Sequence, residues 1–222
     1  MEGARVNAAR GIAGLLVIAG CTAPPATQAG PERTTTAIER TALDSSKTTI
    51  PAGFGTLKQS DVEIVLEPEG VHVAAIPLDE SVIRALAPDS YRRLEATLDS
   101  KRATITQRAS MRGIHDPRVW YVRFYGRAPD AHFVATDLTV TSGGRDYRPF
   151  DVVPISSGFG EQRLQPRDTQ TGLLLFEDGV DVSQPLTVVM GAERNGNWDT
   201  NNILKKLDAE RAAIRARAAA RP

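Results

Sequence analysis

Short segments in which apolar and polar residues alternate constrain this chain most, and they recur between residues 61 and 191. In residues 119–126, VWYVRFYG, the side chains of Trp120, Val122 and Phe124 fall on one face. A period of two is typical of a β-strand with one buried face. Residues 171–177, TGLLLFE, are apolar on both faces, which predicts a central strand.

Turn residues separate these segments. The runs at residues 62–66 and 71–75 flank Pro68-Glu69-Gly70, which predicts a β-hairpin. A second hairpin turn is expected at residues 142–145, SGGR, because glycine accepts positive φ angles.

Three further segments complete the β pattern. Residues 133–141, FVATDLTVT, predict a strand, and residues 186–191, LTVVMG, should pair nearby. Residues 146–155 contain Pro149 and Pro154, so this segment should lie at a sheet edge or contain a bulge.

Two segments have helical character. In residues 79–110, Asp79 or Ser81 can cap a short helix that Pro88 ends, and Asp89 or Ser90 can cap a second one. A single apolar stripe favours a helical insert packed on a sheet edge, and a partner-binding helix pair is the alternative.

The second helical segment is residues 196–222, where Asp199 or Thr200 can cap a C-terminal helix. Its last turns are basic. The basic residues Arg211, Arg215, Arg217 and Arg221 suit the helix dipole, and contact with anionic lipid or another envelope polymer is the alternative. The expected fold is therefore mainly β: an antiparallel β-sandwich over residues 56–195, with a helical insert at 79–110 and the C-terminal helix.

Residues 133–190 contain a Tyr-x-Pro segment, a Leu-x-Pro turn and a Gly-apolar-Phe strand, at Tyr147 and Pro149, Leu164 and Pro166, and Gly172 and Phe176. With an early and a final strand around them, these elements resemble those of immunoglobulin-like domains of secreted and lipid-anchored bacterial proteins. Arg167 stands where a glycine often follows that proline, and the helical insert is foreign to the simplest form. The resemblance implies an immunoglobulin-like sandwich, and a fold alone does not imply a function.

The N-terminus predicts export. Residues 1–20 carry Arg5 and Arg10 before a ten-residue apolar run, which is too short to span a membrane and is typical of a signal peptide. Ile18-Ala19-Gly20-Cys21 resembles the bacterial lipobox. That resemblance implies cleavage before Cys21 and a lipid on its sulfur. Thr22 in place of an aspartate favours the outer membrane in a Gram-negative host, on the periplasmic side or at the cell surface.

Residues 21–55 are rich in Thr, Ser, Pro and Ala, so they predict a flexible linker between the lipidated cysteine and the domain.

Composition excludes several functions. Lys plus Arg and Asp plus Glu both number 27, so no basic field would attract nucleic acid. One cysteine excludes an internal disulfide and a thiolate zinc cluster.

Candidate chemistry is sparse. His115-Asp116 could be metal ligands or an oriented base, and Pro117 favours a surface turn instead. His72 should face solvent, and His132 lies near a turn. Residues 195–201, NGNWDTN, alternate oxygen-bearing side chains as calcium loops do. Thr200 and Lys206 stand where such a loop has glycine and glutamate, so an Asn-Gly turn before a helix cap is favoured. The weak metal candidates are Asn195, Asn197, Asp199 and Asn201.

We therefore expect a lipid-anchored cell-envelope protein with a non-catalytic binding or scaffolding domain and an envelope protein partner. No catalytic residues, metal or cofactor are assigned. Two alternatives remain: an envelope hydrolase that uses carboxylates or His115, and a small-ligand carrier with an apolar cavity between sheet and helices.

Overall fold

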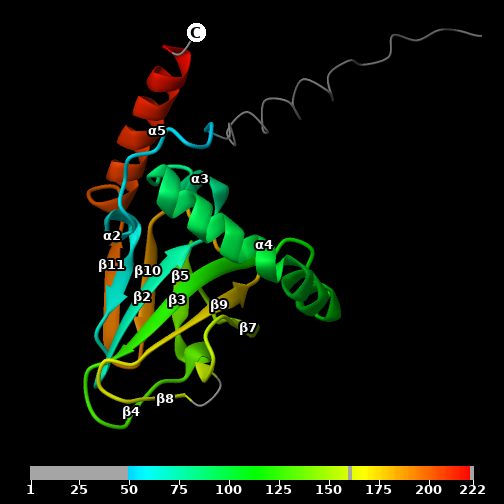
Figure 1. Ribbon diagram of the computed structural model, residues 1–222, viewed down its shortest axis with the longest axis vertical. Helices are drawn as coiled ribbons and strands as arrows, with labels where there is room; N and C mark the ends of the chain where they lie inside the picture. Colours follow the sequence, from blue (N-terminus) through cyan, green and yellow to red (C-terminus); the bar gives the residue numbers. More distant parts are fainter. Residues whose placement is uncertain (1–49, 160–161, 221–222) are drawn as a thin grey trace, which may run out of the picture. The chain divides into compact units, whose positions relative to one another are not determined.

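A computed structural model describes residues 50–159 and 162–220 of the chain (Figure 1). The predicted signal peptide at 1–20, Cys21 and most of the linker lie outside these residues. The described part is mainly β, with antiparallel sheets, a C-terminal helix and a few further helices.

The larger sheet has five strands in the order β1-β2-β3-β9-β7, all antiparallel. Trp120, Val122 and Phe124 on β3 are fully buried, so the predicted alternation is confirmed. The strand predicted to be central, β9, lies between β3 and β7 and is buried on both faces from residue 172 onward. The strands are β1 (Ile64–Leu66), β2 (Val71–Pro77), β3 (Arg118–Gly126), β7 (Asp151–Pro154) and β9 (Thr169–Phe176).

The smaller sheet has four strands in the order β11-β10-β5-β6. They are β5 (Thr139–Ser142), β6 (Arg145–Tyr147), β10 (Leu186–Met190) and β11 (Glu193–Trp198), and a two-stranded ribbon joins β4 (Ala131–His132) to β8 (Arg163–Leu164). Both predicted hairpins are confirmed, with Leu66 paired to Val73 and Ser142 to Arg145. Residues 146–155, which contain Pro149 and Pro154, lie at sheet edges as expected: β6 is an edge strand of the smaller sheet and β7 of the larger one.

One hydrophobic cluster joins residues from both sheets. Trp120 on β3 lies against Phe176 on β9, with ring centroids 5.7 Å apart. Phe124 stacks on Phe133 at 4.1 Å, and Phe159 meets both rings edge-on. Buried side chains of β5 and β10 belong to the same cluster, so each sheet buries one face in a shared core.

Helices α3 (Glu80–Ile83) and α4 (Pro88–Met111) form the predicted insert, and Figure 1 shows α4 passing across one end of the larger sheet. Asp79 Oδ1 accepts a hydrogen bond from Ser81 N at 2.8 Å, which confirms this cap. The second predicted cap is wrong because Pro88 occupies the first turn of α4, where its missing N–H costs nothing. The buried face of α4 is Tyr91, Leu94, Ile105 and Ala109.

The expected C-terminal helix is present as α5 (Ile203–Ala219), and it buries Ile203, Leu204, Leu207, Glu210 and Ile214. Asp199 and Thr200 do not cap it, because the helix begins after Asn202. A short helix, α2 (Gln59–Val62), precedes β1.

Three expectations need correction. The strand expected over residues 133–141 is interrupted by a 3-10 turn, η2 (Ala135–Asp137), so Val134 is exposed and only the part from residue 139 is a strand. Residues 195–198 form β11 rather than a turn, so the boundary placed at 195 falls inside a strand. The linker was expected to reach residue 55, but Ile50 is already buried and its carbonyl accepts from Arg84 Nη1 at 3.1 Å.

Candidate binding cleft

A cleft of about 860 Å³ lies where α3, the start of β3, the loop after β9 and α5 meet. Its buried lining is aliphatic, from Ile50, Val180 and Val182. The remaining lining side chains are charged or hydroxylic: Asp79, Glu80, Ser81, Arg118, Asp178, Asp181, Ser183, Asp208, Arg211 and Arg215.

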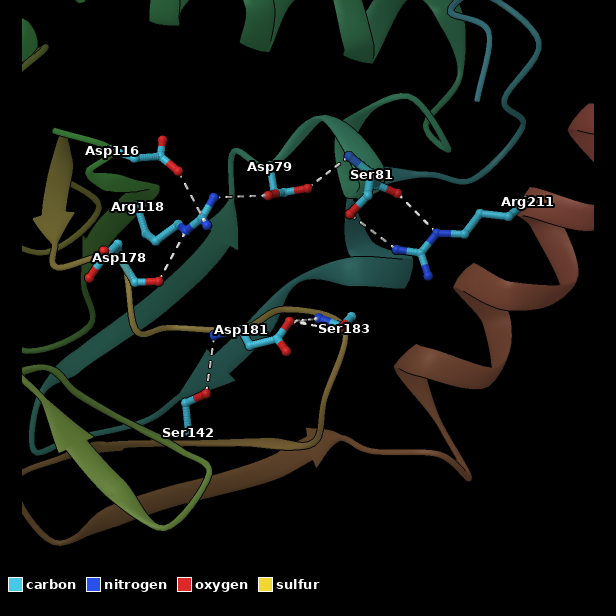
Figure 2. A network of polar contacts seen from close by, with 9 residues as sticks. All are labelled: Asp79, Ser81, Asp116, Arg118, Ser142, Asp178, Asp181, Ser183 and Arg211. Atoms are coloured by element: carbon cyan, nitrogen blue, oxygen red, sulfur yellow. Dashed lines mark hydrogen bonds and ion pairs between the residues drawn. The ribbon is translucent and has the colours of Figure 1, made fainter. Parts of the chain in front are cut away.

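Arg118 holds one wall of the cleft together. Its guanidinium lies 3.7 Å from Asp79 Oδ2 and 3.3 Å from Asp116 Oδ2, and its Nε donates to the carbonyl of Asp178 at 3.5 Å (Figure 2). Arg118 is the first residue of β3, Asp79 precedes α3 and Asp178 follows β9. One side chain therefore ties three chain segments at the same end of the larger sheet.

Arg211 on α5 holds the opposite wall. Its Nε donates to the carbonyl of Ser81 at 3.1 Å, Nη2 lies 3.3 Å from Ser81 Oγ, and Nη1 donates to Asp208 Oδ1 at 2.9 Å. Figure 2 shows the contacts between Arg211 and Ser81 continuing through Asp79 to Arg118. The row of polar contacts thus runs from β3 through α3 to α5.

The third wall is the loop between β9 and β10. Asp181 N donates to Ser142 Oγ at 3.1 Å, which fastens the loop to β5. Asp181 Oδ1 accepts from Ser183 N at 2.9 Å and from Ser183 Oγ at 2.6 Å (Figure 2). This side chain-to-backbone turn gives the loop a defined shape.

Charge in the cleft is unbalanced. Five carboxylates and three guanidiniums line it. Arg118 and Arg211 already lie beside carboxylates. Within residues 50–159 and 162–220, no hydrogen bond or ion pair involves the Asp178 carboxylate or the Arg215 guanidinium, and both residues are exposed. The lining is therefore net negative by two charges.

The predicted histidine candidates lie apart from this cleft and from one another. His115 is exposed in the loop between α4 and β3 and does not line the cleft, although its neighbour Asp116 pairs with Arg118. His132 is exposed on β4. The structure therefore does not bring His115 together with the cleft carboxylates.

His72 lies on the outer face of the larger sheet, in a shallow depression of about 500 Å³. Its Nδ1 is 2.7 Å from Glu67 Oε1, and Arg127 binds the other oxygen of the same carboxylate. The hydrogen bond from His72, with a further one from Arg127, lowers the pKa of Glu67.

The weak metal candidates occupy β11 and the turn after it. Asn195 Nδ2 donates to the carbonyl of Val65 at 2.8 Å, and its Oδ1 accepts from Asn197 N at 2.8 Å. Asp199 Oδ1 accepts from Asn201 N at 2.9 Å. Two of the four candidate side chains, Asn195 and Asp199, thus already have an oxygen engaged by the backbone. In the described part of the chain, no three His, Cys, Asp or Glu side chains group closely enough to hold a metal ion.

Two of the arginines on α5 make contacts within the domain. Arg211 binds Ser81, and Arg217 binds the carbonyl of Phe54 and the carboxylate of Glu210. The alternative of an anionic-lipid surface on this helix therefore loses two of its four arginines. A third, Arg221, lies outside the described residues.

Sequence reasoning missed the cleft itself. In the sequence, Asp79 and Ser81 carry only the signal of a helix cap, and Arg118 and Asp181 belong to no recognisable motif. Comparison with known proteins adds nothing to these observations, since no family model, curated protein or solved structure matches the chain. Over the described residues, no helix is both long and apolar enough to cross a membrane.

Proposed function

We propose that this chain is a lipid-anchored cell-envelope protein whose β-rich domain binds an envelope partner without catalysing a reaction. The cleft carries the binding part of this proposal. Its hydroxyl groups are engaged by charged neighbours, Ser81 by Arg211 and Ser183 by Asp181. Nucleophilic catalysis by serine needs a base that is free to take the hydroxyl proton. The neighbour of Ser81 Oγ is a guanidinium, which is not a base, and Asp181 Oδ1 also accepts from Ser183 N and so closes a local turn, which favours a structural role for both hydroxyls.

Two alternatives are less well supported. A hydrolase based on His115 would need this imidazole near a reacting group, and it lies on an exposed loop away from the cleft lining. A small-ligand carrier would need a mainly apolar cavity, and charged side chains dominate the cleft.

The anchor rests on the sequence. Arg5 and Arg10, the apolar run at 11–20 and the Ile18–Cys21 motif occur in the order expected of a lipoprotein precursor. Cys21 would carry the acyl chains, and more than one chain is needed for stable anchoring. Thr22 supports the outer membrane as the final location in a Gram-negative host.

The anchor is tested with Cys21→Ala in a Gram-negative host fed labelled palmitate. We expect the unsubstituted chain to incorporate label and to lose residues 1–20, whereas the variant stays unlabelled and uncut. Ser46→Ala, in the linker, is the matched control and should mature normally. Labelled, anchored Cys21→Ala protein would contradict the proposal. Thr22→Asp should move the mature protein to the inner membrane.

Binding is tested by crosslinking the lipidated protein in its native cells and identifying captured molecules by mass spectrometry. One dominant envelope protein, recovered repeatedly, is the expected result. Absence of any reproducible protein partner would contradict the scaffolding role.

We also infer that the two sheets form an immunoglobulin-like sandwich. In such domains the first, second, fifth and fourth strands make one sheet, and the third, sixth and seventh make the other, with an extra strand in variable-type domains. If β2 is taken as the first strand, the orders β2-β3-β9-β7 and β11-β10-β5-β6 follow this connectivity. Sheets crossing at about −30° in a crystal structure would support the inference, and a crossing near 90° would contradict it.

A further inference from the structure

The cleft combines a negative rim with an aliphatic interior. Carboxylates approach it from three elements: Asp79 and Glu80 at α3, Asp178 and Asp181 in the loop after β9, and Asp208 on α5. The guanidiniums of Arg118 and Arg211 donate hydrogen bonds to backbone carbonyls of the cleft walls, those of Asp178 and Ser81. Asp79, Glu80 and Asp208 are each paired with an arginine, namely Arg118, Arg84 and Arg211. The carboxylates of Asp178 and Asp181 have no ion-pair partner within the described residues, so an incoming positive charge meets a rim that is only partly neutralised.

The buried lining narrows the class of ligand further. Ile50, Val180 and Val182 form an aliphatic floor with only 1–6% of their surface exposed, and no aromatic ring lines the cleft among the described residues. Sugars and nucleobases are usually held by stacking on aromatic rings, so this lining does not favour them. The side chain of lysine or arginine fits better, because its methylene stem packs on aliphatic groups while its charged end reaches a polar rim.

We propose that this cleft docks a cationic peptide segment of a partner protein, with one or more Lys or Arg side chains flanked by small apolar residues. This inference rests on the proposed binding function and names its ligand chemistry. Asp178, whose carboxylate has no hydrogen-bond or ion-pair partner among residues 50–159 and 162–220, receives the cation. Arg215, exposed at the cleft and without a carboxylate partner in the described chain, opposes cations and so lowers the affinity.

The probes are two blocked pentapeptides, acetyl-AKVKA-amide and acetyl-AEVEA-amide, added to the full ¹⁵N-labelled chain as purified from the expressing cells. We expect the lysine peptide to shift the backbone amide signals of Ser81, Asp181 and Ser183 in a saturable manner. The glutamate peptide should leave them unchanged. The shift should weaken as salt is added, because part of the attraction is between solvent-exposed charges.

Three variants sharpen the test. Asp178→Asn combined with Asp208→Asn should weaken the lysine peptide about fivefold or more, since it removes two carboxylates at a partly exposed site. Arg215→Ala should tighten binding about threefold by removing a repulsive charge. Glu193→Gln is the matched control. Glu193 is exposed on β11 and is not part of the cleft lining, so this variant should not change the affinity. Circular dichroism checks that each variant is folded.

Equal responses to both peptides, signals that never saturate, or weaker binding by Arg215→Ala would overturn the proposal. These outcomes are separate from failure of the proposed function. If the wild-type chain incorporated no palmitate, the proposed envelope location would fail, but peptide binding by the cleft could still be measured. A lipidated chain that captures a partner but ignores the lysine peptide would place docking on another face.

Discussion

Glu210 Oε1 lies 2.8 Å from the backbone nitrogen of Thr56 and 2.9 Å from its hydroxyl, across 154 positions of the chain. The same oxygen accepts from Arg217 Nη2 at 2.7 Å. Three donors therefore converge on one nearly buried carboxylate of α5. This contact joins the C-terminal helix to the first part of the folded domain.

Glu210→Ala should lower the free energy of unfolding by about 2–3 kcal/mol, because it removes the nearly buried charged acceptor that three hydrogen bonds share. Urea denaturation measures the loss. Hydrogen exchange should also speed up at residues 54–57. Asp208→Asn on the same helix, with its carboxylate largely exposed, is the control and should cost less than about 1 kcal/mol. Equal losses from the two variants would contradict the role assigned to Glu210.

Gly172 on β9 is packed against Phe159. An added Cβ would lie 2.7 Å from Phe159 Cζ, and that ring also meets Phe124 and Phe133. Gly172→Ala should therefore destabilise the fold by about 1–3 kcal/mol, as overpacking of a core does. Gly196→Ala on β11 has only Thr187 Oγ1 nearby, at 3.8 Å, and should be neutral or slightly stabilising. Thermal unfolding of both variants checks the contrast, and a neutral Gly172→Ala would refute it.

Arg167 adopts φ = 72° at the third position of the turn Gln165–Asp168, behind Pro166. Left-handed backbone strains any residue with a side chain, so Arg167→Gly should raise the free energy of unfolding by about 1 kcal/mol. The hydrogen bond from the backbone nitrogen at 167 to the carbonyl of Gly126 can remain. Arg163→Gly, in β8, should instead destabilise. Denaturant midpoints that fall in both variants would contradict the prediction.

Tyr91 links stability to high pH. Burial, followed by a hydrogen bond to Glu95 and the charge of Glu80, raises the pKa of its phenol from 10.0 to about 12. Its hydroxyl donates to Glu95 Oε1 at 2.8 Å. Between pH 10 and 12 the unfolded chain loses this proton while the folded chain keeps it. The stabilisation is complete below pH 10 and is lost as pH rises through this window.

The loss across that window should be about 2–3 kcal/mol relative to Tyr91→Phe, which has no phenol proton to lose. Urea denaturation of both proteins at several pH values between 9 and 12 measures it. Parallel pH profiles for the two proteins would show that the phenol keeps an ordinary pKa.

Sequence reasoning predicted those elements whose local pattern agrees with their final surroundings. The alternation at Trp120, Val122 and Phe124 and the apolar run of β9 specify strands without further information. Strand β11 was missed because five of its six residues are polar or glycine, so only its pairing with β10 makes it a strand. The strand predicted over residues 133–141 was wrong around Val134, because an apolar residue beside a 3-10 turn has the same local pattern as a residue in a strand.

The cleft lay beyond such reasoning for a different reason. Its charged residues come from the ends of α3 and β9, the start of β3 and the middle of α5, and none follows a motif. Their meeting depends on the strand order, which brings Arg118 opposite Phe176 and places Trp120 opposite Pro77. Such juxtaposition is a property of the tertiary fold.

The contacts of residues 50–57 also determine where a mechanical force applied at the N-terminal side of the domain would be transmitted. Leu57 pairs in parallel with the segment at residues 85–87, through Leu57 N to the Ala85 carbonyl and Ala87 N to the Leu57 carbonyl. Together with Glu210 and Arg84, these bonds would spread a force applied at Ile50 into α3 and α5. Because these contacts precede β1 along the chain, such a force would reach α3 and α5, and with them two walls of the cleft, before it reaches β1.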